Sequence, residues 1–116
     1  MTATDQLHPV FHALGDPNRM RLITRLCDAG PGSTSQVAKA VSVSRQAATK
    51  HLLILEEAGL VRSDRRGRER IWRMQPEALD DASEYLDRLA RRWDRALGRL
   101  RAFVEAPEQP DPGMSE

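Results

Sequence analysis

Four polar residues near the start of one periodic segment carry the most informative chemistry in this sequence. They are Arg45, Gln46, Thr49 and Lys50, within SRQAATKHLLILEEAGLV from Ser44 to Val61. Arginine can bond bidentately to O6 and N7 of guanine, glutamine can do the same to N6 and N7 of adenine, and threonine or lysine can reach phosphates or base edges. These residue types suggest contact with double-stranded DNA.

The same segment is predicted to be a helix that turns those side chains outward. Ala48, Leu52 and Leu55 are spaced i, i+4 and i+7, and Ala58-Gly59 ends the pattern. Because the apolar face must point inward, the polar residues face water or a ligand. The alternative is that they form an ordinary solvated surface.

A second short helix is predicted just before this one. Ser33-Thr34-Ser35-Gln36 has the S-x-x-Q form of a capping box, and Ser42-Val43-Ser44 leaves room for only a tight turn. Two short helices joined in this way have the layout of a helix-turn-helix, whose second helix enters the major groove. Ser44 begins that second helix, and a helix N-terminus favours an anion.

Two more helices are predicted nearer the N-terminus. The first ends at Gly15, and the second begins at the N-cap Asp16 before Pro17 and ends near Gly30. Their apolar positions are Leu7, Val10, Phe11 and Leu14 in the first helix, and Met20, Ile23, Leu26 and Cys27 in the second. Cys27 is therefore expected to be a buried core thiol, with a redox sensor as the alternative.

After Leu60 the pattern changes to that of a β-hairpin with a basic tip. The runs LVRSD and RERIWRM are separated by Arg65-Arg66-Gly67, with glycine where a hairpin turn needs positive φ. From Ser44 to Met74 there are eight basic side chains against four acidic ones, although the whole chain has a net charge of only +1. A locally basic face is thus expected.

The segment beyond Pro76 has the longest apolar period in the chain. Its apolar residues follow a heptad seam: Leu79, Ala82, Leu86, Leu89, Trp93, Ala96, Leu100 and Phe103. A helix of this length spans roughly 40 Å, which is more than so small a domain can cover. Part of this seam is expected to pack against another chain.

Length and composition predict one domain over residues 1–106 and a disordered tail over residues 107–116. The chain has 116 residues, and the tail is rich in proline and acid. No apolar run approaches the roughly 18 residues of a membrane span, and the polar N-terminus lacks the features of a secretory signal. A single cysteine excludes an internal disulfide. A cytoplasmic protein without membrane contact is expected.

These motifs together resemble the ArsR family of bacterial winged-helix repressors, from about His8 to Glu105. The resemblance rests on HPVFHALGDPNRMRLITRL, VSVSRQAATKHLLILEEAGLV and RRGRERIWRM, in that order. It implies a mainly α fold with a small β-hairpin, a winged helix-turn-helix with a long C-terminal dimerisation helix. It also implies a homodimer on an inverted-repeat operator.

The resemblance assigns roles to particular residues. Major-groove or backbone contacts fall to Ser44, Arg45, Gln46, Thr49, Lys50 and His51, and minor-groove or phosphate contacts to Arg65, Arg66 and Arg68. The dimer contacts fall to Leu7, Phe11, Leu86, Leu89, Trp93, Leu100 and Phe103. For His51 the alternative is a packed, hydrogen-bonded histidine beside Leu52.

The sequence departs from the family at its metal sites. Where many relatives carry a Cys-x-Cys metal-sensing pair, this chain has Ser33 and Ser35, which are poor ligands for soft metals. The final helix has no histidine, and its acidic residues alternate with arginines as in a solvated, salt-bridged face. His8 and His12 are spaced i, i+4 but lack a third ligand. No metal or cofactor is expected, and Ser42 replaces a frequent turn glycine.

The expected function is a homodimeric, sequence-specific DNA-binding transcriptional regulator, a repressor in type. The alternative is a dimeric protein-interaction module with little DNA binding. An enzyme is a weaker alternative, because the sequence has no phosphate-binding glycine loop and no nucleophile paired with a base. The effector is open: a small molecule at the dimer interface, a partner protein, or none.

Overall fold

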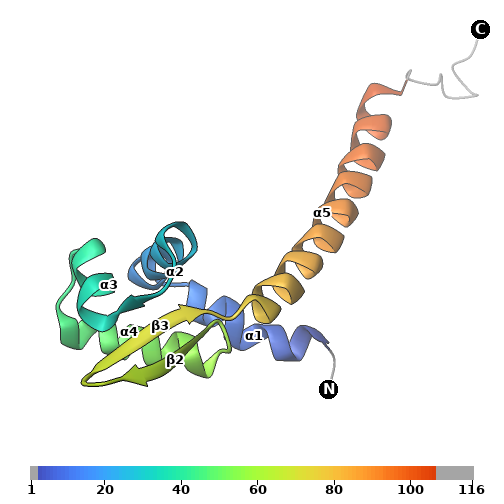
Figure 1. The fold of residues 1–116 in the computed structure, drawn as a ribbon. Helices are drawn as coiled ribbons and strands as arrows, with labels where there is room; N and C mark the ends of the chain where they lie inside the picture. Colours follow the sequence, from blue (N-terminus) through green and yellow to red (C-terminus); the bar gives the residue numbers. More distant parts are fainter. Residues whose placement is uncertain (1–2, 107–116) are drawn as a thin grey trace, which may run out of the picture. The chain divides into compact units, whose positions relative to one another are not determined.

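Residues 3–106 are described by the computed structural model, with side chains from Leu7 onward. The contacts divide the chain into two units, one up to Glu84 and one from Tyr85. The predicted tail, residues 107–116, lies outside the described residues. The elements are α1 (Ala3–Leu14), α2 (Pro17–Ala29), β1 (Gly32–Ser33), α3 (Thr34–Ala40), α4 (Arg45–Glu57), β2 (Val61–Arg66), β3 (Glu69–Met74) and α5 (Pro76–Glu105) (Figure 1).

Side-chain caps begin the three central helices where the sequence predicts them. Asp16 accepts hydrogen bonds from the N–H groups of Asn18 and Arg19 at 2.9 and 3.0 Å at the start of α2. Ser33 and Gln36 form both bonds of the capping box of α3. Such caps stabilise a helix by about 1 kcal/mol each. The predicted helix starts are confirmed.

The hairpin is part of a small antiparallel sheet of order β1-β3-β2. The short strand β1, which the sequence did not predict, pairs Gly32 with Trp72 on β3. The hairpin turn is Gly67-Arg68, with φ +64° at Gly67, the position where a II′ turn requires glycine. The predicted tip was therefore misplaced, because Arg65 and Arg66 still pair with β3.

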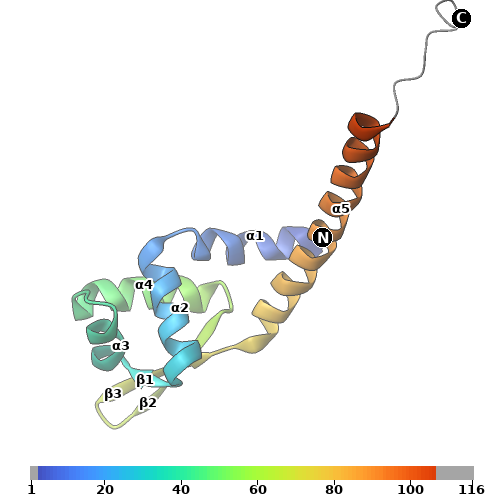
Figure 2. The same cartoon turned by 90° about the horizontal axis from the view of Figure 1, so that it is seen from above.

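The core of the first unit forms where the helices pack on the sheet. Its largest fully buried side chains are Trp72, Leu22, Leu52, Leu55, Leu60 and Val37. Figure 2 shows α2 crossing α4, with β1 joining the end of α2 to the sheet. Burying each of these side chains contributes about 1.5–3 kcal/mol. The inward face predicted for α4 is confirmed, since Ala48, Leu52 and Leu55 are all buried.

The turn between α3 and α4 depends on a strained serine. Ser42 has φ +59°, and within residues 3–106 it is the one non-glycine residue with positive φ. The N–H of Val43 then bonds to the carbonyl of Ala38 at 3.1 Å. Ser42 thus adopts the left-handed backbone that glycine accepts most readily, and this turn directs the chain from one helix into the next.

Three predicted core or interface positions differ in the structure. The buried arc of α2 is centred on Leu22, Ile23 and Leu26, and Met20 and Cys27 lie just beyond its edge. Met20 is 55% exposed and the Cys27 thiol is also exposed, so the prediction of a buried thiol was wrong.

Leu7 differs in the other direction. Expected at the dimer interface, it is only 5% exposed and belongs to the core of its own chain.

Among residues 3–106, none of the helices combines the length and apolar character that crossing a membrane requires.

Candidate nucleic-acid interface

The first turns of α4 hold the four predicted base-reading residues around one shallow hollow. Arg45, Gln46, Thr49 and Lys50 line this depression of about 440 Å³. Arg45, Gln46 and Lys50 are exposed, and their side chains have no hydrogen-bond or ion-pair partner within the part of the chain that the structure describes. Their polar ends are therefore free to bind a ligand, whereas they add nothing to the core.

Thr49 and Ser44 are already engaged with the backbone of α4. The Thr49 hydroxyl donates to the carbonyl of Arg45 at 2.9 Å, so it retains only acceptor capacity and its methyl group for a base. The Ser44 hydroxyl accepts the N–H of Ala47 at 3.0 Å as the N-cap. Because it accepts there, its own proton stays available to a phosphate oxygen.

His51 points from α4 toward the start of α2. Its Nδ1 lies 3.4 Å from Nη1 of Arg19 and 3.9 Å from a carboxylate oxygen of Asp16. The structure thus shows the packed alternative for Nδ1, whereas Nε2 has no partner among the described residues. Nε2 is therefore the ring nitrogen that can still bind a ligand.

The surroundings of Asp16 favour its ionised form. The hydrogen bond from the backbone N–H of Arg19 holds the pKa of Asp16 below its usual 3.8, and the positive charges of Arg19 and of protonated His51 act in the same direction. Partial desolvation opposes them. The carboxylate therefore stays ionised at neutral pH, at the point where α2 meets α4.

Arg19 joins three helices, a role that the sequence analysis missed. Its Nε donates to the carbonyl of Ala13 at 2.6 Å and its Nη2 to that of His12 at 3.4 Å, at the C-terminus of α1. Its Nη1 lies 3.4 Å from Nδ1 of His51 on α4. Because these partners are up to 32 residues away in sequence, no local pattern indicates the contact. Arg19 positions α4 against α1 and α2.

The arginines of the hairpin differ in the side of the sheet from which they project. Successive residues of a strand point to opposite faces, so Arg65 and Arg66 do not form one cluster. Arg65 pairs across the hairpin with Arg70, and like charges in this position destabilise a sheet. The side chains of Arg65, Arg66 and Arg68 are exposed and have no hydrogen-bond or ion-pair partner in the described part of the chain. They are positioned for an anion rather than for stability.

Arg70, in contrast, is held by its own chain. Its Nε donates to the Ser63 hydroxyl at 2.8 Å, its Nη2 lies 3.5 Å from Glu56, and its guanidinium lies 4.8 Å from the centre of the Trp72 ring. The Ser63 hydroxyl in turn donates to Glu56 at 2.8 Å. This network ties the end of α4 to the hairpin, and so fixes these two elements relative to each other.

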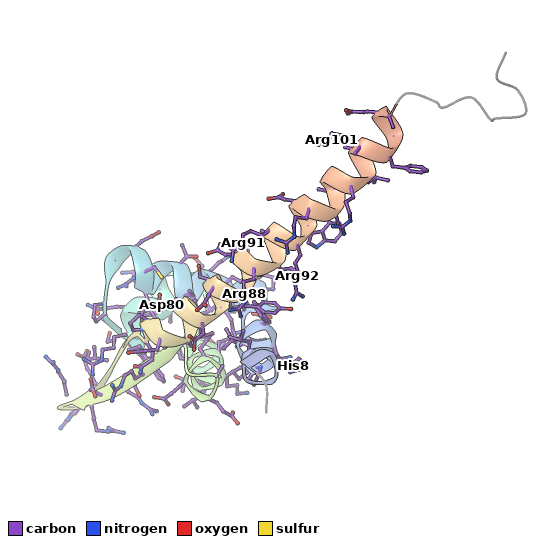
Figure 3. The ribbon with its side chains drawn as sticks, turned by 90° about the vertical axis from the view of Figure 1, so that its right-hand side faces the viewer. His8, Asp80, Arg88, Arg91, Arg92 and Arg101 are labelled. Atoms are coloured by element: carbon purple, nitrogen blue, oxygen red, sulfur yellow. The ribbon has the colours of Figure 1, made fainter. Side chains whose placement is uncertain are left out.

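The α5 helix carries an exposed apolar stripe. Leu86, Trp93, Leu100 and Phe103 are 49%, 61%, 58% and 83% exposed in the single chain, and Leu89 is half-buried, as is Phe11 on α1. Isolated chains rarely expose such a row of large apolar side chains unless another surface covers it. Charged side chains of α5, among them Arg88, Arg91, Arg92 and Arg101, project from the helix in different directions (Figure 3).

Comparisons with known proteins agree with this geometry. A family profile described as a helix-turn-helix domain matches residues 14–64. The HTH-type transcriptional regulator Rv2034 of Mycobacterium tuberculosis is 34% identical over 96 residues, which cover 83% of this chain and 86% of that protein. The structure of an ArsR-like transcriptional regulator from Rhodococcus sp. RHA1 is 36% identical, covers 90% of this chain and 97% of its own, and superposes with a TM-score of 0.72.

The chain belongs to the ArsR family of winged helix-turn-helix transcriptional regulators. A more distant ArsR-type fold is a fragment from Mycobacterium bovis, described as a homodimeric winged helix-turn-helix DNA-binding domain. It is 21% identical, covers 91% of this chain and 88% of its own, and has a TM-score of 0.60. The predicted fold, mainly α with a hairpin wing and a long last helix, is confirmed.

The thiolate metal site found in many ArsR-family regulators does not fit this chain. The residue at its first position, Ser33, is buried and uses its hydroxyl to cap α3, and Ser35 offers only a neutral hydroxyl. His8 and His12 are exposed with their rings stacked 6.5 Å apart. Within the described residues, no group of three or more His, Cys, Asp or Glu is arranged to hold a metal ion.

Proposed function

We propose that this ArsR-family regulator is a homodimer that binds an inverted-repeat operator and represses transcription without the family's thiolate metal site. The observation that carries the proposal is the hollow on α4, where Arg45, Gln46 and Lys50 are exposed without partners. Arginine and glutamine are the side chains best suited to bidentate bonds with guanine and adenine. The DNA-binding set is Ser44, Arg45, Gln46, Thr49, Lys50, His51, Arg65, Arg66 and Arg68.

The exposed stripe of α5 supports the dimer. A second chain would cover the stripe residues Leu86, Leu89, Trp93, Leu100 and Phe103, together with Phe11 on α1. A protein with this fold is described as homodimeric. The proposed functional unit is residues 1–106 of each chain. A symmetric dimer presents two copies of α4 about 34 Å apart, so the operator should contain two inverted half-sites on one face of the duplex.

A gel shift tests the proposal directly. The full chain is incubated with the DNA upstream of its own gene and with random DNA of equal length at moderate salt, and the protected bases are then mapped by footprinting. We expect preferential binding and two protected half-sites about one helical turn apart. Equal binding to both DNAs would favour the second candidate, a protein-interaction module built on the stripe of α5.

The direction of regulation needs a separate test. A promoter–reporter fusion carrying the footprinted operator should lose expression when the chain is supplied, because a dimer over the promoter blocks transcription. Increased expression would contradict repression while leaving DNA binding intact. A regulator of a bacterial chromosome acts in the cytoplasm, which is where we place this chain.

A further inference from the structure

A cavity of about 200 Å³ lies where α3, α4 and the hairpin meet. Three arginines from separate segments line it: Arg45 begins α4, Arg68 is in the hairpin turn, and Arg70 is on β3. We call it the three-arginine cavity. Its other lining residues are Ser33, Thr34, Ser35 and Glu69.

The charges in this cavity are not balanced within the chain. Arg70 is compensated by Glu56, but Arg45 and Arg68 have no ion-pair partner among the described residues, and neither does Glu69. Even if Glu69 offsets one arginine, an excess of positive charge is held in a small hollow. Like charges brought together in this way repel each other unless an anion lies between them.

The hydroxyl groups of the cavity can add donors to this positive charge. The Ser33 hydroxyl accepts the N–H of Gln36 at 3.2 Å, and the Thr34 hydroxyl accepts the indole N–H of Trp72 at 2.8 Å. A hydroxyl that accepts a hydrogen bond still has its own proton to donate. Guanidinium and hydroxyl donors together suit an oxyanion, and arginine forks match phosphate oxygens particularly well.

The walls of the cavity are fixed before any ligand arrives. Ser33 on β1 pairs with Ile71 on β3, and the Thr34–Trp72 hydrogen bond joins the start of α3 to the same strand. A preformed site loses little conformational freedom on binding. The wall formed by Ser33, Thr34 and the hydrogen-bonded Arg70 is therefore preformed, and the exposed side chains of Arg45 and Arg68 complete the cavity.

We propose that the three-arginine cavity is an oxyanion site that receives one phosphodiester of the DNA backbone. This inference rests on the proposed function, in which α4 lies against DNA, and it adds a contact that joins α3, α4 and the hairpin turn around a single phosphate. Free inorganic phosphate offers the same chemistry, so the experiment must separate the two sources.

The first measurement uses the chain's two tryptophans. Trp72 touches the wall of the cavity, whereas Trp93 is exposed on α5 and serves as the internal control. The full chain is titrated with sodium phosphate, or with sodium chloride at matched ionic strength, while the two indole N–H resonances are followed by NMR. We expect a saturable, phosphate-specific shift of Trp72 alone.

Two arginine variants with the same charge change complete this measurement. Arg68→Ala should weaken the phosphate response at least fivefold, whereas Arg62→Ala, an exposed arginine of β2 outside the cavity lining, should preserve it. Identical responses to phosphate and chloride, or equal behaviour of the two variants, would overturn the oxyanion site.

The second measurement identifies the source of the oxyanion. At matched ionic strength, phosphate should weaken DNA binding more than chloride does, and Arg68→Ala should abolish that difference. If the chain binds DNA but the two salts act equally, the assignment to the backbone is wrong and the proposed function stands.

Two further outcomes would assign the cavity to free phosphate. A Trp72 response that persists at saturating DNA would mean that the backbone does not occupy the cavity, which overturns the proposal. A Trp72 response in a chain that binds no DNA would overturn both this proposal and the proposed function.

Discussion

The indole N–H of Trp72 donates a hydrogen bond across 2.8 Å to the hydroxyl oxygen of Thr34, and both residues are buried. The bond connects the hairpin to the first residue of α3, although the two residues are 38 positions apart in sequence. It keeps the wing and the helix-turn-helix in one rigid unit.

Thr34→Val should therefore destabilise the fold. Valine has a similar shape but leaves the buried indole N–H without an acceptor, which costs about 1–3 kcal/mol. Urea denaturation measures the loss, with Ser35→Ala as the exposed neighbouring control, expected within about 0.5 kcal/mol of the original chain. Equal stability of the two variants would show that the hydrogen bond carries no net energy.

Ser42→Gly should stabilise the chain by about 0.5–1 kcal/mol. The left-handed backbone at Ser42 is unfavourable for a residue with a Cβ, by about 1–2 kcal/mol. Glycine removes this strain but adds freedom to the unfolded chain, which returns part of the gain. Thermal denaturation should show a higher Tm for Ser42→Gly than for the original chain. Ser42→Ala should show no such increase in Tm. An equal Tm for both would mean that the turn is not strained.

Asp16 should make stability depend on pH in the acid range. Its pKa is lowered in the folded chain, so its ionised form adds stability above the ordinary pKa of 3.8, and that contribution is lost as pH falls through the folded pKa. Asp16→Asn retains a good N-cap without the charge. The stability difference between the two chains should shrink below about pH 4 in denaturation at several pH values. A difference that is constant from pH 7 to pH 2.5 would exclude this linkage.

Leu100→Gln should shift the chain from dimer to monomer. Leu100 is 58% exposed on the proposed seam, and burying a leucine contributes about 1.5–3 kcal/mol per chain. Analytical ultracentrifugation should show at least a tenfold weaker dimer. The control is Arg101→Gln, at the charged residue next to it. Unchanged helical circular dichroism would show that α5 still forms, and an unaffected dimer would place the interface elsewhere.

Replacing base-reading and phosphate-contacting residues should have different effects on DNA binding. Gln46→Ala should relax base preference by about 1–3 kcal/mol at particular positions. Arg66→Ala should instead weaken binding to specific and nonspecific DNA alike. The slope of log affinity against log salt concentration should fall by about one, because one phosphate contact is lost. Competition binding with single-base operator variants at several salt concentrations separates these effects. Equal losses on all sequences from both kinds of variant would contradict the division.

The sequence predicted those parts of the fold that depend on near neighbours. The cap at Asp16 and the capping box at Ser33 are set by residues two or three positions away, so the helix starts are confirmed. The strand β1 was missed because two residues cannot show an alternating pattern. The exposure of Cys27 was misjudged because it lies only a little outside the buried arc of α2, which a helical period cannot resolve.

The candidate site was predictable to a similar extent. The outward direction of Arg45 and Gln46 follows from the period of α4, and the structure places them at one hollow. The supporting contacts, Arg19 with His51 and Arg70 with Glu56, join residues from different elements. Such pairs depend on how the elements pack, so no spacing in the sequence indicates them.

The uncovered stripe of α5 has a consequence for the cell. In the proposed dimer, a second chain gains contacts that dilution removes, so mass action links the fraction of paired chains to their total concentration. The dimer dissociation constant then sets a copy number below which the operator stands empty. Such a regulator would respond to its own abundance, and growth in cell volume without new synthesis of the chain would relieve repression.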